Sequence, residues 1–309
     1  MEATATTSKK VFFDEETESI ETDASLTQLI SPFNMKRQFL EYVFVNINHY
    51  KFDSWKTFVT ADPDKKIKIS QMLFNPNWSD FFFHPKMLGH VTKLEETLTK
   101  FHNQKNKVIV PPPELVFNAF NIVSPAMIRV IFLGQDPYPG GRNAMGLSFG
   151  IPLGMNRSKS QINIFNNLMK FHHIDEMPQT GCLAAWVLQG CLMINAALTT
   201  FQGEPDAHTK DYREFTKGLM KYLNNLPQRI IFVIWGSKAL AVVEPINRTK
   251  HCVIASSHPS PYSYSGTMKG FVDGKSEIFP SFESTNWAKF VNTDLRNRGE
   301  PEIVWDMII

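Results

Sequence analysis

Two short polar loops each directly follow an apolar run that is typical of a buried strand. The first loop, Gly-Gln-Asp-Pro-Tyr at 134–138, follows residues 128–133, and the second, His-Pro-Ser-Pro at 258–261, follows residues 252–256. One loop offers a carboxylate and the other an imidazole. Held in one site, these two groups can position a water molecule, stabilise a developing charge or transfer a proton.

Two further apolar runs between these loops also end in polar residues. Residues 191–194 lead into Asn195, and residues 230–235 lead into a Gly-Ser turn at 236–237. Such runs, rich in β-branched side chains and separated by helical stretches, predict parallel strands covered on both faces. Because ligands bind at the carboxyl ends of these strands, all four loops are expected at one crevice. We therefore predict a single α/β domain with a central, mostly parallel sheet of about four strands flanked by helices.

The flanking helices are predicted from apolar residues at helical spacing. Ser237 is the expected N-cap of one helix and Ser284 of the last, since a serine side chain accepts a hydrogen bond from the first turn. The predicted helices span residues 87–101, 160–171, 212–226, 237–243 and 285–298.

Each polar loop also has a purely structural interpretation. Asp136 and Asn195 could cap the turns that follow them, and His258 could be a hydrogen-bonded loop histidine. Four such loops at four successive strand ends favour a functional site, but spacing alone leaves its class open. It indicates either a hydrolase or a nucleotide-binding module that holds an acid, an amide and an imidazole.

Charge is unevenly distributed along the 309 residues. Residues 1–35 carry seven acidic and two basic side chains, a balance of −5, so the rest carries +7 of the total net charge of +2. A basic body behind an acidic segment is typical of a polyanion-binding protein, with ordinary surface charge as the alternative. Three cysteines are too few for a disulfide scaffold, no Cys/His cluster indicates a metal, and no apolar stretch is long enough to span a membrane.

Composition divides the chain into three parts. Residues 1–32 are acidic and rich in Thr and Ser, and we expect them to be disordered. Residues 33–75 form an N-terminal extension in which aromatic residues recur at helical spacing, so we expect it to be helical. Residues 76–309 hold the predicted sheet and its loops. In the acidic part, Phe12 and Phe13 form an apolar spot that is either a partner-docking motif or a casual pair.

The motifs, in their order and separation, resemble those of the family-1 uracil-DNA glycosylases. The resemblance covers roughly three quarters of the chain, and it makes residues 76–309 the expected catalytic domain. It is specific, because other glycosylase groups of this superfamily lack the Gln-Asp-Pro-Tyr loop with its aspartate. The matching motifs are Gly-Gln-Asp-Pro-Tyr at 134–138, Leu-Met-Ile-Asn-Ala-Ala-Leu-Thr at 192–199, Trp-Gly-Ser at 235–237, His-Pro-Ser-Pro at 258–261, Gly-Leu-Ser-Phe at 146–149 and the prolines at 111–113.

This resemblance implies a monofunctional enzyme of base excision repair. It would flip uracil out of DNA and hydrolyse the N-glycosidic bond, leaving an abasic site, with no metal or organic cofactor. Asp136 resembles the carboxylate that positions the attacking water and stabilises the sugar cation. His258 resembles the imidazole that donates a hydrogen bond to uracil O2, and the main-chain N–H of Gln135 would add to this oxyanion site.

Other residues resemble the family's base-reading and DNA-binding sets. Asn195 would accept from uracil N3–H and donate to O4, a pattern that cytosine reverses. Tyr138 would exclude the C5 methyl group of thymine, and Phe149 would stack on the flipped ring. The small hydroxyls that would grip DNA phosphates are those of Ser160, Ser237 and Ser260.

The chain also departs from the family pattern in two places near these residues. Pro139 stands where most of the family has a phosphate-contacting histidine; poxvirus members, which double as replication processivity factors, also have proline here. Residues 155–159 replace a proline-rich segment and introduce two cations, Arg157 and Lys159, which we expect to contact phosphate.

A third departure concerns the residue that would fill the gap left by a flipped base. Tyr262 replaces the family's intercalating leucine, at the start of a longer loop that runs to Gly270. An aromatic ring can act as a wedge, so Tyr262 is the predicted wedge. Tyr264 and Met268 are its rivals, and packing of Tyr262 against its own loop is the alternative.

The expected partner is uracil-containing DNA, single- or double-stranded, bound by a monomer. The N-terminal segment is a candidate contact for a replication or repair protein, and we expect the protein in the nucleus, or in the host nucleus if it is viral. One alternative is a DNA-binding replication subunit with weak glycosylase activity, which Pro139 favours and Asp136, Asn195 and His258 oppose. Another is a thymine- or mismatch-directed glycosylase, which Tyr138 opposes.

Overall fold

The computed structural model describes residues 54–243, 245–272 and 274–306. The predictions of a disordered acidic tail, of a Phe12–Phe13 docking motif and of helix in the first part of the N-terminal extension fall on residues 1–53, outside the described residues. Among the residues that are described, no helix is both long enough and apolar enough to cross a membrane.

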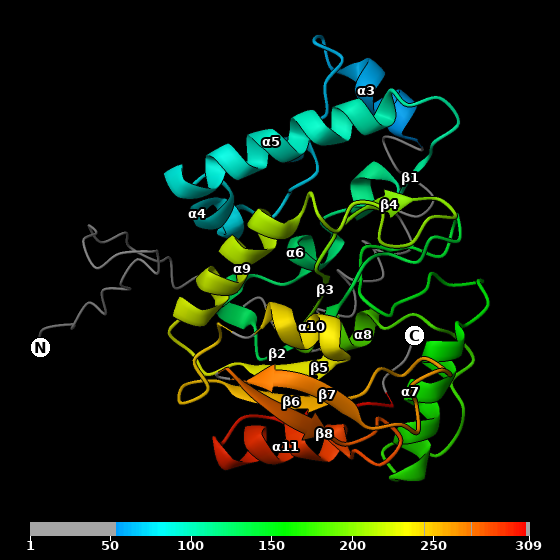
Figure 1. Ribbon diagram of the computed structural model, residues 1–309, viewed down its shortest axis with the longest axis vertical. Coiled ribbons are helices and arrows are strands. Elements are labelled where there is room, and N and C mark those ends of the chain that lie inside the picture. Colours follow the sequence, from blue (N-terminus) through cyan, green and yellow to red (C-terminus); the bar gives the residue numbers. More distant parts are fainter. Residues whose placement is uncertain (1–53, 244, 273, 307–309) are drawn as a thin grey trace, which may run out of the picture.

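Four parallel strands form the centre of the molecule (Figure 1), as predicted. They are β2 (Val130–Gly134), β3 (Cys191–Asn195), β5 (Ile231–Trp235) and β6 (Cys252–Ser256), in the spatial order β3-β2-β5-β6. The register pairs Gly134 with Asn195 and Trp235 with Ser256, so the carboxyl ends of the strands lie level at one edge. The predicted α/β fold is confirmed, and the polar loops leave the sheet together.

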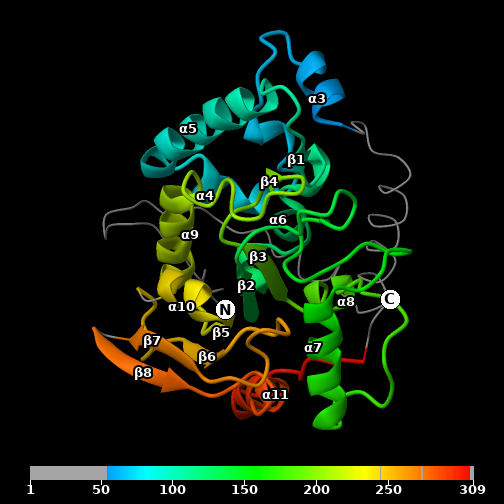
Figure 2. The ribbon, with the colours of Figure 1, turned by 45° about the vertical axis from the view of Figure 1, so that its right-hand side comes forward.

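Helices cover both faces of this sheet, which is why every residue of β2 and β5 is buried. In Figure 1, α9 (Arg213–Asn225) and α10 (Ser237–Val242) lie on one side of β5 and β6, and α11 (Trp287–Asn297) lies on the other. Figure 2 shows α7 (Lys159–Lys170) standing beside α8 (Ala184–Val187). Further helices are α4 (Ser79–Phe82), α5 (Pro85–His102) and α6 (Asn118–Ile122). All five predicted helices are therefore confirmed, with small differences at their ends.

Both predicted helix caps are wrong. The N-cap of α10 is Gly236, whose φ of 100° turns the chain out of β5, and Ser237 is the first helical residue. The N-cap of α11 is Asn286, whose side chain accepts a hydrogen bond from the main-chain N–H of Lys289. Ser284 lies two residues before this cap and instead donates to the main-chain oxygen of Ser281 at 3.2 Å.

The N-terminal helices share the core of the sheet. Helix α3 (Trp55–Ala61) buries Trp55 and Phe58 in this core, and the indole N–H of Trp55 donates to the main-chain oxygen of Pro111 at 3.0 Å. Further along, the ring of Phe81 in α4 packs edge-on against Phe215 in α9, with 5.5 Å between centroids. Aromatic pairs of this kind stabilise beyond the area they bury. From Ser54 onward, the described part of the extension thus packs against the main body.

A short hairpin replaces part of the loop predicted between Tyr262 and Gly270. Strand β7 (Met268–Val272) pairs antiparallel with β8 (Lys275–Phe279). Met268 and Val272 are buried, whereas Phe271 between them is exposed, as expected for a strand with one covered face. The prediction of a loop through Gly270 is therefore wrong at its end. A second antiparallel pair joins β1 (Ile109–Val110) to β4 (Thr200–Phe201).

Candidate active site

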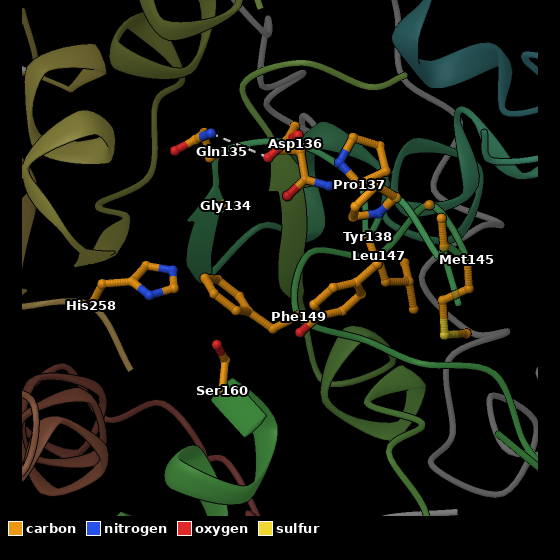
Figure 3. Close-up of a pocket in the computed structure, with 14 residues that line it drawn as sticks. Gly134, Gln135, Asp136, Pro137, Tyr138, Met145, Leu147, Phe149, Ser160 and His258 are labelled. Carbon is orange, nitrogen blue, oxygen red and sulfur yellow. Dashed lines mark hydrogen bonds between the residues drawn. The ribbon is translucent and has the colours of Figure 1, made fainter. Parts of the chain in front are cut away.

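A cavity of about 200 Å³ opens at the carboxyl edge of the sheet (Figure 3). Its wall is formed by the ends of β2 and β3, the loops that follow β2 and β6, and the start of α7. The structure brings seven of the predicted site residues into its lining: Gln135, Asp136, Tyr138, Phe149, Ser160, Asn195 and His258. The other five predicted residues lie outside the lining: Arg157, Lys159, Ser237, Ser260 and Tyr262.

Asp136 is the carboxylate of this cavity. Burial is the main reason that its pKa lies above the ordinary range of an aspartate. Its Oδ2 accepts a hydrogen bond from the main-chain N–H of Asp206 at 2.7 Å, and its Oδ1 accepts one from Nε2 of Gln135 at 3.3 Å. A carboxylate with few compensating bonds in a poorly solvated place stabilises a nearby cation more strongly than one in water does.

His258 presents one ring nitrogen as a hydrogen-bond donor. Its Nδ1 accepts from the main-chain N–H of Ser260 at 3.0 Å, so a neutral ring carries its proton on Nε2. Burial lowers the pKa of His258 to about 4, so the ring is neutral near pH 7. The Phe149 ring lies 5.9 Å from the His258 ring, centroid to centroid (Figure 3). The site therefore offers an uncharged N–H donor beside an aromatic ring.

The side chain of Asn195 reaches the cavity across the end of β2. A Cβ at position 134 would lie 2.1 Å from Oδ1 of Asn195, so any larger residue there would displace this amide. Gly134 and Asn195 are direct partners in the register of β2 and β3. The glycine of the Gly-Gln-Asp-Pro-Tyr loop thus clears the path for an amide from the neighbouring strand.

Phe149 is held by a tight loop that crosses the sheet end. Gly146 has a φ of 72°, and a Cβ there would lie 1.7 Å from the main-chain oxygen of Leu115, so only glycine fits. The hydroxyl of Ser148 donates to the main-chain oxygen of Phe132 in β2 at 3.0 Å, which fastens the loop to the sheet. Phe149 itself packs edge-on against Trp235, with 4.9 Å between centroids. Its ring is therefore fixed before any ligand enters.

Tyr138 is tied to the start of α7. Its hydroxyl lies 2.9 Å from Oγ of Ser158, and burial raises the pKa of the phenol to about 12. The same Ser158 oxygen caps α7 by accepting from the main-chain N–H of Gln161 at 3.1 Å. One serine thereby fixes both the tyrosine ring and the helix end that carries Ser160 into the cavity.

The predicted DNA-contacting residues lie around this cavity at chain turns. Ser237 begins α10, directly after β5, and is exposed. Ser260 lies in the His258 loop, with its hydroxyl 2.9 Å from that of Ser263. Lys159 is exposed at the first turn of α7, whereas the guanidinium of Arg157 is partly buried and donates to the main-chain oxygen of Pro178.

The three candidates for the wedge differ sharply in exposure. Tyr262 is fully exposed, at 101% of its reference area. Tyr264 is partly buried and packs against Phe282, with ring centroids 5.8 Å apart. Met268 is 7% exposed and belongs to β7. Insertion of Met268 into DNA would require β7 to unfold, and insertion of Tyr264 would break its packing in the core.

Several residues that contact the site were not predicted from the sequence. Ser158 belongs to no recognised motif. Its place just before a predicted helix, however, is a signal that could have identified it as the cap. Asp206, which donates its main-chain N–H to Asp136, is 70 residues away along the chain in a loop with no recognised motif. Lys238 ion-pairs with Asp206 at 2.7 Å. Within the described residues, no group of three His, Cys, Asp or Glu side chains is arranged to hold a metal ion.

Comparison with known proteins places this chain in a family. The family model of the uracil DNA glycosylase superfamily matches residues 120–279. A probable uracil-DNA glycosylase of Acanthamoeba polyphaga mimivirus is 40% identical over 275 residues, which are 86% of this chain and 73% of that protein. A uracil-DNA glycosylase of Psychromonas ingrahamii is 35% identical over 230 residues, 74% of this chain and all of that protein.

Solved structures agree with this assignment. The crystal structure of mimivirus uracil-DNA glycosylase superposes with a TM-score of 0.81 and 40% identity, and covers 87% of this chain and 99% of the viral one. A tyrosine-to-leucine variant of that viral enzyme, solved in complex with UGI, also matches with a TM-score of 0.81. The chain belongs to the uracil DNA glycosylase superfamily.

Proposed function

We propose that Asp136 and His258 carry out the hydrolysis of the uracil–deoxyribose bond for which this superfamily is named. The observation that supports this most directly is that both side chains line one cavity of about 200 Å³. Asp136 offers a carboxylate there, and His258 offers a neutral hydrogen-bond donor. As the bond breaks, positive charge develops on the sugar and negative charge on the leaving base. An ionised Asp136 stabilises the sugar cation and positions the attacking water, and the Nε2–H of neutral His258 donates to uracil O2.

Base selection is assigned to three other residues of the cavity. The Asn195 amide pairs with N3–H and O4 of uracil and rejects cytosine, which presents the opposite donor and acceptor. Phe149 stacks on the flipped base, and the close packing of this ring against Trp235 keeps it in place. Tyr138 stands against C5, where its hydrogen bond to Ser158 prevents the ring from swinging away from a thymine methyl.

DNA is held by residues at the start of α7 and in the loops around the cavity. Ser237, Ser260 and Ser160 offer hydroxyls and neighbouring main-chain N–H groups to phosphates. Lys159 and Arg157 add positive charge at the start of α7, where the helix dipole also favours an anion. Tyr262 fills the gap left by the flipped base, because it alone of the three candidates is free of the core.

The decisive experiment measures uracil release from a single-stranded oligonucleotide with one deoxyuridine. Asp136→Asn is expected to lower kcat by about two orders of magnitude or more, since a positioned charged group is lost. Asp175→Asn, which changes an exposed aspartate outside the cavity lining, serves as the matched control and is expected to keep the wild-type rate.

Two outcomes would contradict the proposal. Normal turnover by Asp136→Asn would remove this carboxylate from the mechanism. Binding of DNA by the native protein without release of uracil would favour the alternative of a replication subunit that has kept the fold for binding alone.

We extend the proposal to the surroundings of the enzyme. It acts as a monomer on both single- and double-stranded DNA in the nucleus, or in a host nucleus if it is viral. The acidic residues 1–32 and the extension 33–75 are the proposed contact for a replication or repair protein. The charge contrast between residues 1–35 and the rest, −5 against +7, supports a role for the acidic segment away from the DNA-binding face.

A further inference from the structure

Asp206 touches the catalytic carboxylate through its main chain. Its N–H donates to Oδ2 of Asp136 at 2.7 Å. Asp206 lies in the exposed loop between β4 and α9 and has a φ of 65°, a conformation that side chains other than glycine, asparagine and aspartate rarely adopt. An exposed loop residue in this conformation needs other bonds to keep its N–H aimed at one atom.

The side chain of Asp206 supplies those bonds. Its Oδ2 accepts from Nζ of Lys238 at 2.7 Å, and its Oδ1 accepts from the hydroxyl of Thr209 at 3.2 Å. Nε2 of Gln135 also donates to Oδ1 of Asp206, and the same amide donates to Oδ1 of Asp136 at 3.3 Å. Gln135 thus joins the two carboxyl groups, and Lys238 holds the outer one from the first turn of α10.

Charge in this cluster acts on Asp136 in two opposite directions. The negative charge of Asp206 raises the pKa of Asp136, and the positive charge of Lys238 lowers it, while burial remains the largest cause of the shift. Asp206 and Lys238 are the charged groups that act on Asp136, and neutral His258 shares the cavity. Lys238 therefore offsets the repulsion that an acidic loop residue would otherwise impose on a carboxylate that must be ionised to act.

We propose that Asp206 and Lys238 are positioning residues for the glycosylase reaction: their ion pair, with Thr209 and Gln135, holds the Asp206 N–H on one oxygen of Asp136. This hydrogen bond fixes the rotation of the carboxylate, so that its field and its water-binding oxygen face the cavity. The inference rests on the proposed catalytic role of Asp136. The side chains of Asp206 and Lys238 lie outside the lining of the cavity, and they connect Asp136 to the surface at α10.

Two substitutions of Asp206 separate its side chain from its main chain. Asp206→Gly tolerates the left-handed conformation but removes all the side-chain anchors, so kcat is expected to fall about tenfold, the usual effect of losing one hydrogen bond to a charged group. Asp206→Asn keeps an oxygen for Thr209 and Gln135 and also tolerates a positive φ, but it loses the ion pair with Lys238. Its kcat is therefore expected to lie between those of the wild type and Asp206→Gly. The KM for single-stranded DNA is expected to change little in both variants.

The pH profile of kcat distinguishes positioning from simple structural damage. Asp206→Asn removes the charge that raises the pKa of Asp136, so the acidic limb should move to lower pH. Lys238→Met removes the charge that lowers it, so the acidic limb should move to higher pH. Lys217→Met is the matched control, because it breaks another exposed lysine–carboxylate pair, 2.9 Å from Glu214 on α9, and should leave both kcat and the limb unchanged.

The outcomes separate this inference from the assignment of Asp136. Wild-type kcat in Asp206→Gly, together with an inactive Asp136→Asn, would overturn the positioning role and leave the catalytic assignment intact. A fall in kcat and in Tm with no movement of the acidic limb in Asp206→Asn or Lys238→Met would also overturn it, because loop packing alone would then explain the loss. An active Asp136→Asn would overturn both.

Discussion

At the residue scale, the site depends on neutral or poorly solvated groups rather than on strong ion pairs. His258 is fixed as an Nε2–H donor by one main-chain N–H, and its pKa of about 4 keeps it uncharged near neutral pH. The pKa of Asp136 is raised, so its ionised form is less stable in the folded site than in water. The ionised Asp136 therefore carries a free-energy penalty that is offset when positive charge develops on the substrate.

Tyr138 provides the clearest test of a single residue. Tyr138→Ala removes the ring that is held by Ser158, and we expect the cavity to accept the thymine methyl while still releasing uracil. The measurement is release of free thymine from normal single-stranded DNA at high enzyme concentration. Tyr262→Ala, which alters a fully exposed tyrosine outside the cavity lining, should release no thymine. Failure of Tyr138→Ala to release thymine would remove Tyr138 as the residue that excludes it.

At the element scale, the start of α7 connects secondary structure to selectivity. Ser158 caps the helix through Gln161 and also binds the hydroxyl of Tyr138. The helix brings Ser160 to the cavity and Lys159 to the surface beside it. The serine that caps the helix therefore also orients the Tyr138 ring of the site.

A pair of cap substitutions tests this double role. Ser158→Ala and Ser54→Ala each remove an N-cap serine, of α7 and of α3, so each should lower the free energy of unfolding by about 1 kcal/mol. Only Ser158→Ala should also raise the rate of thymine release, because only Ser158 contacts Tyr138. Urea unfolding and the thymine assay provide the two measurements. Equal selectivity in both variants would show that the bond between Tyr138 and Ser158 has no functional role.

At the scale of the whole molecule, buried histidines couple stability to pH. His208 and His258 both have pKa values lowered by burial to about 4. The ring of His208 stacks on Phe101, with 4.2 Å between centroids, and its Nδ1 lies 2.9 Å from the hydroxyl of Thr199. In the folded protein both rings stay neutral down to about pH 4, whereas in the unfolded chain they are protonated at the ordinary histidine pKa.

Stability should therefore fall as the pH falls from about 7 to 5.5, where the unfolded state binds more protons. Each of the two histidines contributes a slope of up to about 1.4 kcal/mol per pH unit once the unfolded chain is protonated. The pKa values of Asp136 and Glu95 are raised in the folded protein, so their protonation at lower pH stabilises the folded state and opposes the effect of the histidines. Burial also lowers the pKa values of His102 and His251, which add to the same slope. Urea midpoints across this range give the slope, and His258→Asn should reduce it without removing it. A flat profile in the native protein would show that the rings are not kept neutral by the fold.

The sequence alone determined the four central strands, the main helices and the grouping of the candidate site residues, because these depend on local patterns. Buried parallel strands require continuous apolar runs, and the loops that follow them must meet at one edge, so Asp136, Asn195 and His258 could be grouped without coordinates. The family's motifs then predicted a role for each residue. Predictions for residues 1–53 remain outside the described structure.

Only the tertiary structure decided the features that depend on contacts between distant segments. It brought Asp206 to Asp136 across 70 residues, and it placed Met268 in a strand that removes it as a wedge. It also made Gly236 the cap of α10 and gave His258 its tautomer. Hydrogen-bond partners, burial and the resulting pKa values arise from three-dimensional packing, and no periodicity in a linear sequence encodes which distant group will lie 3 Å away.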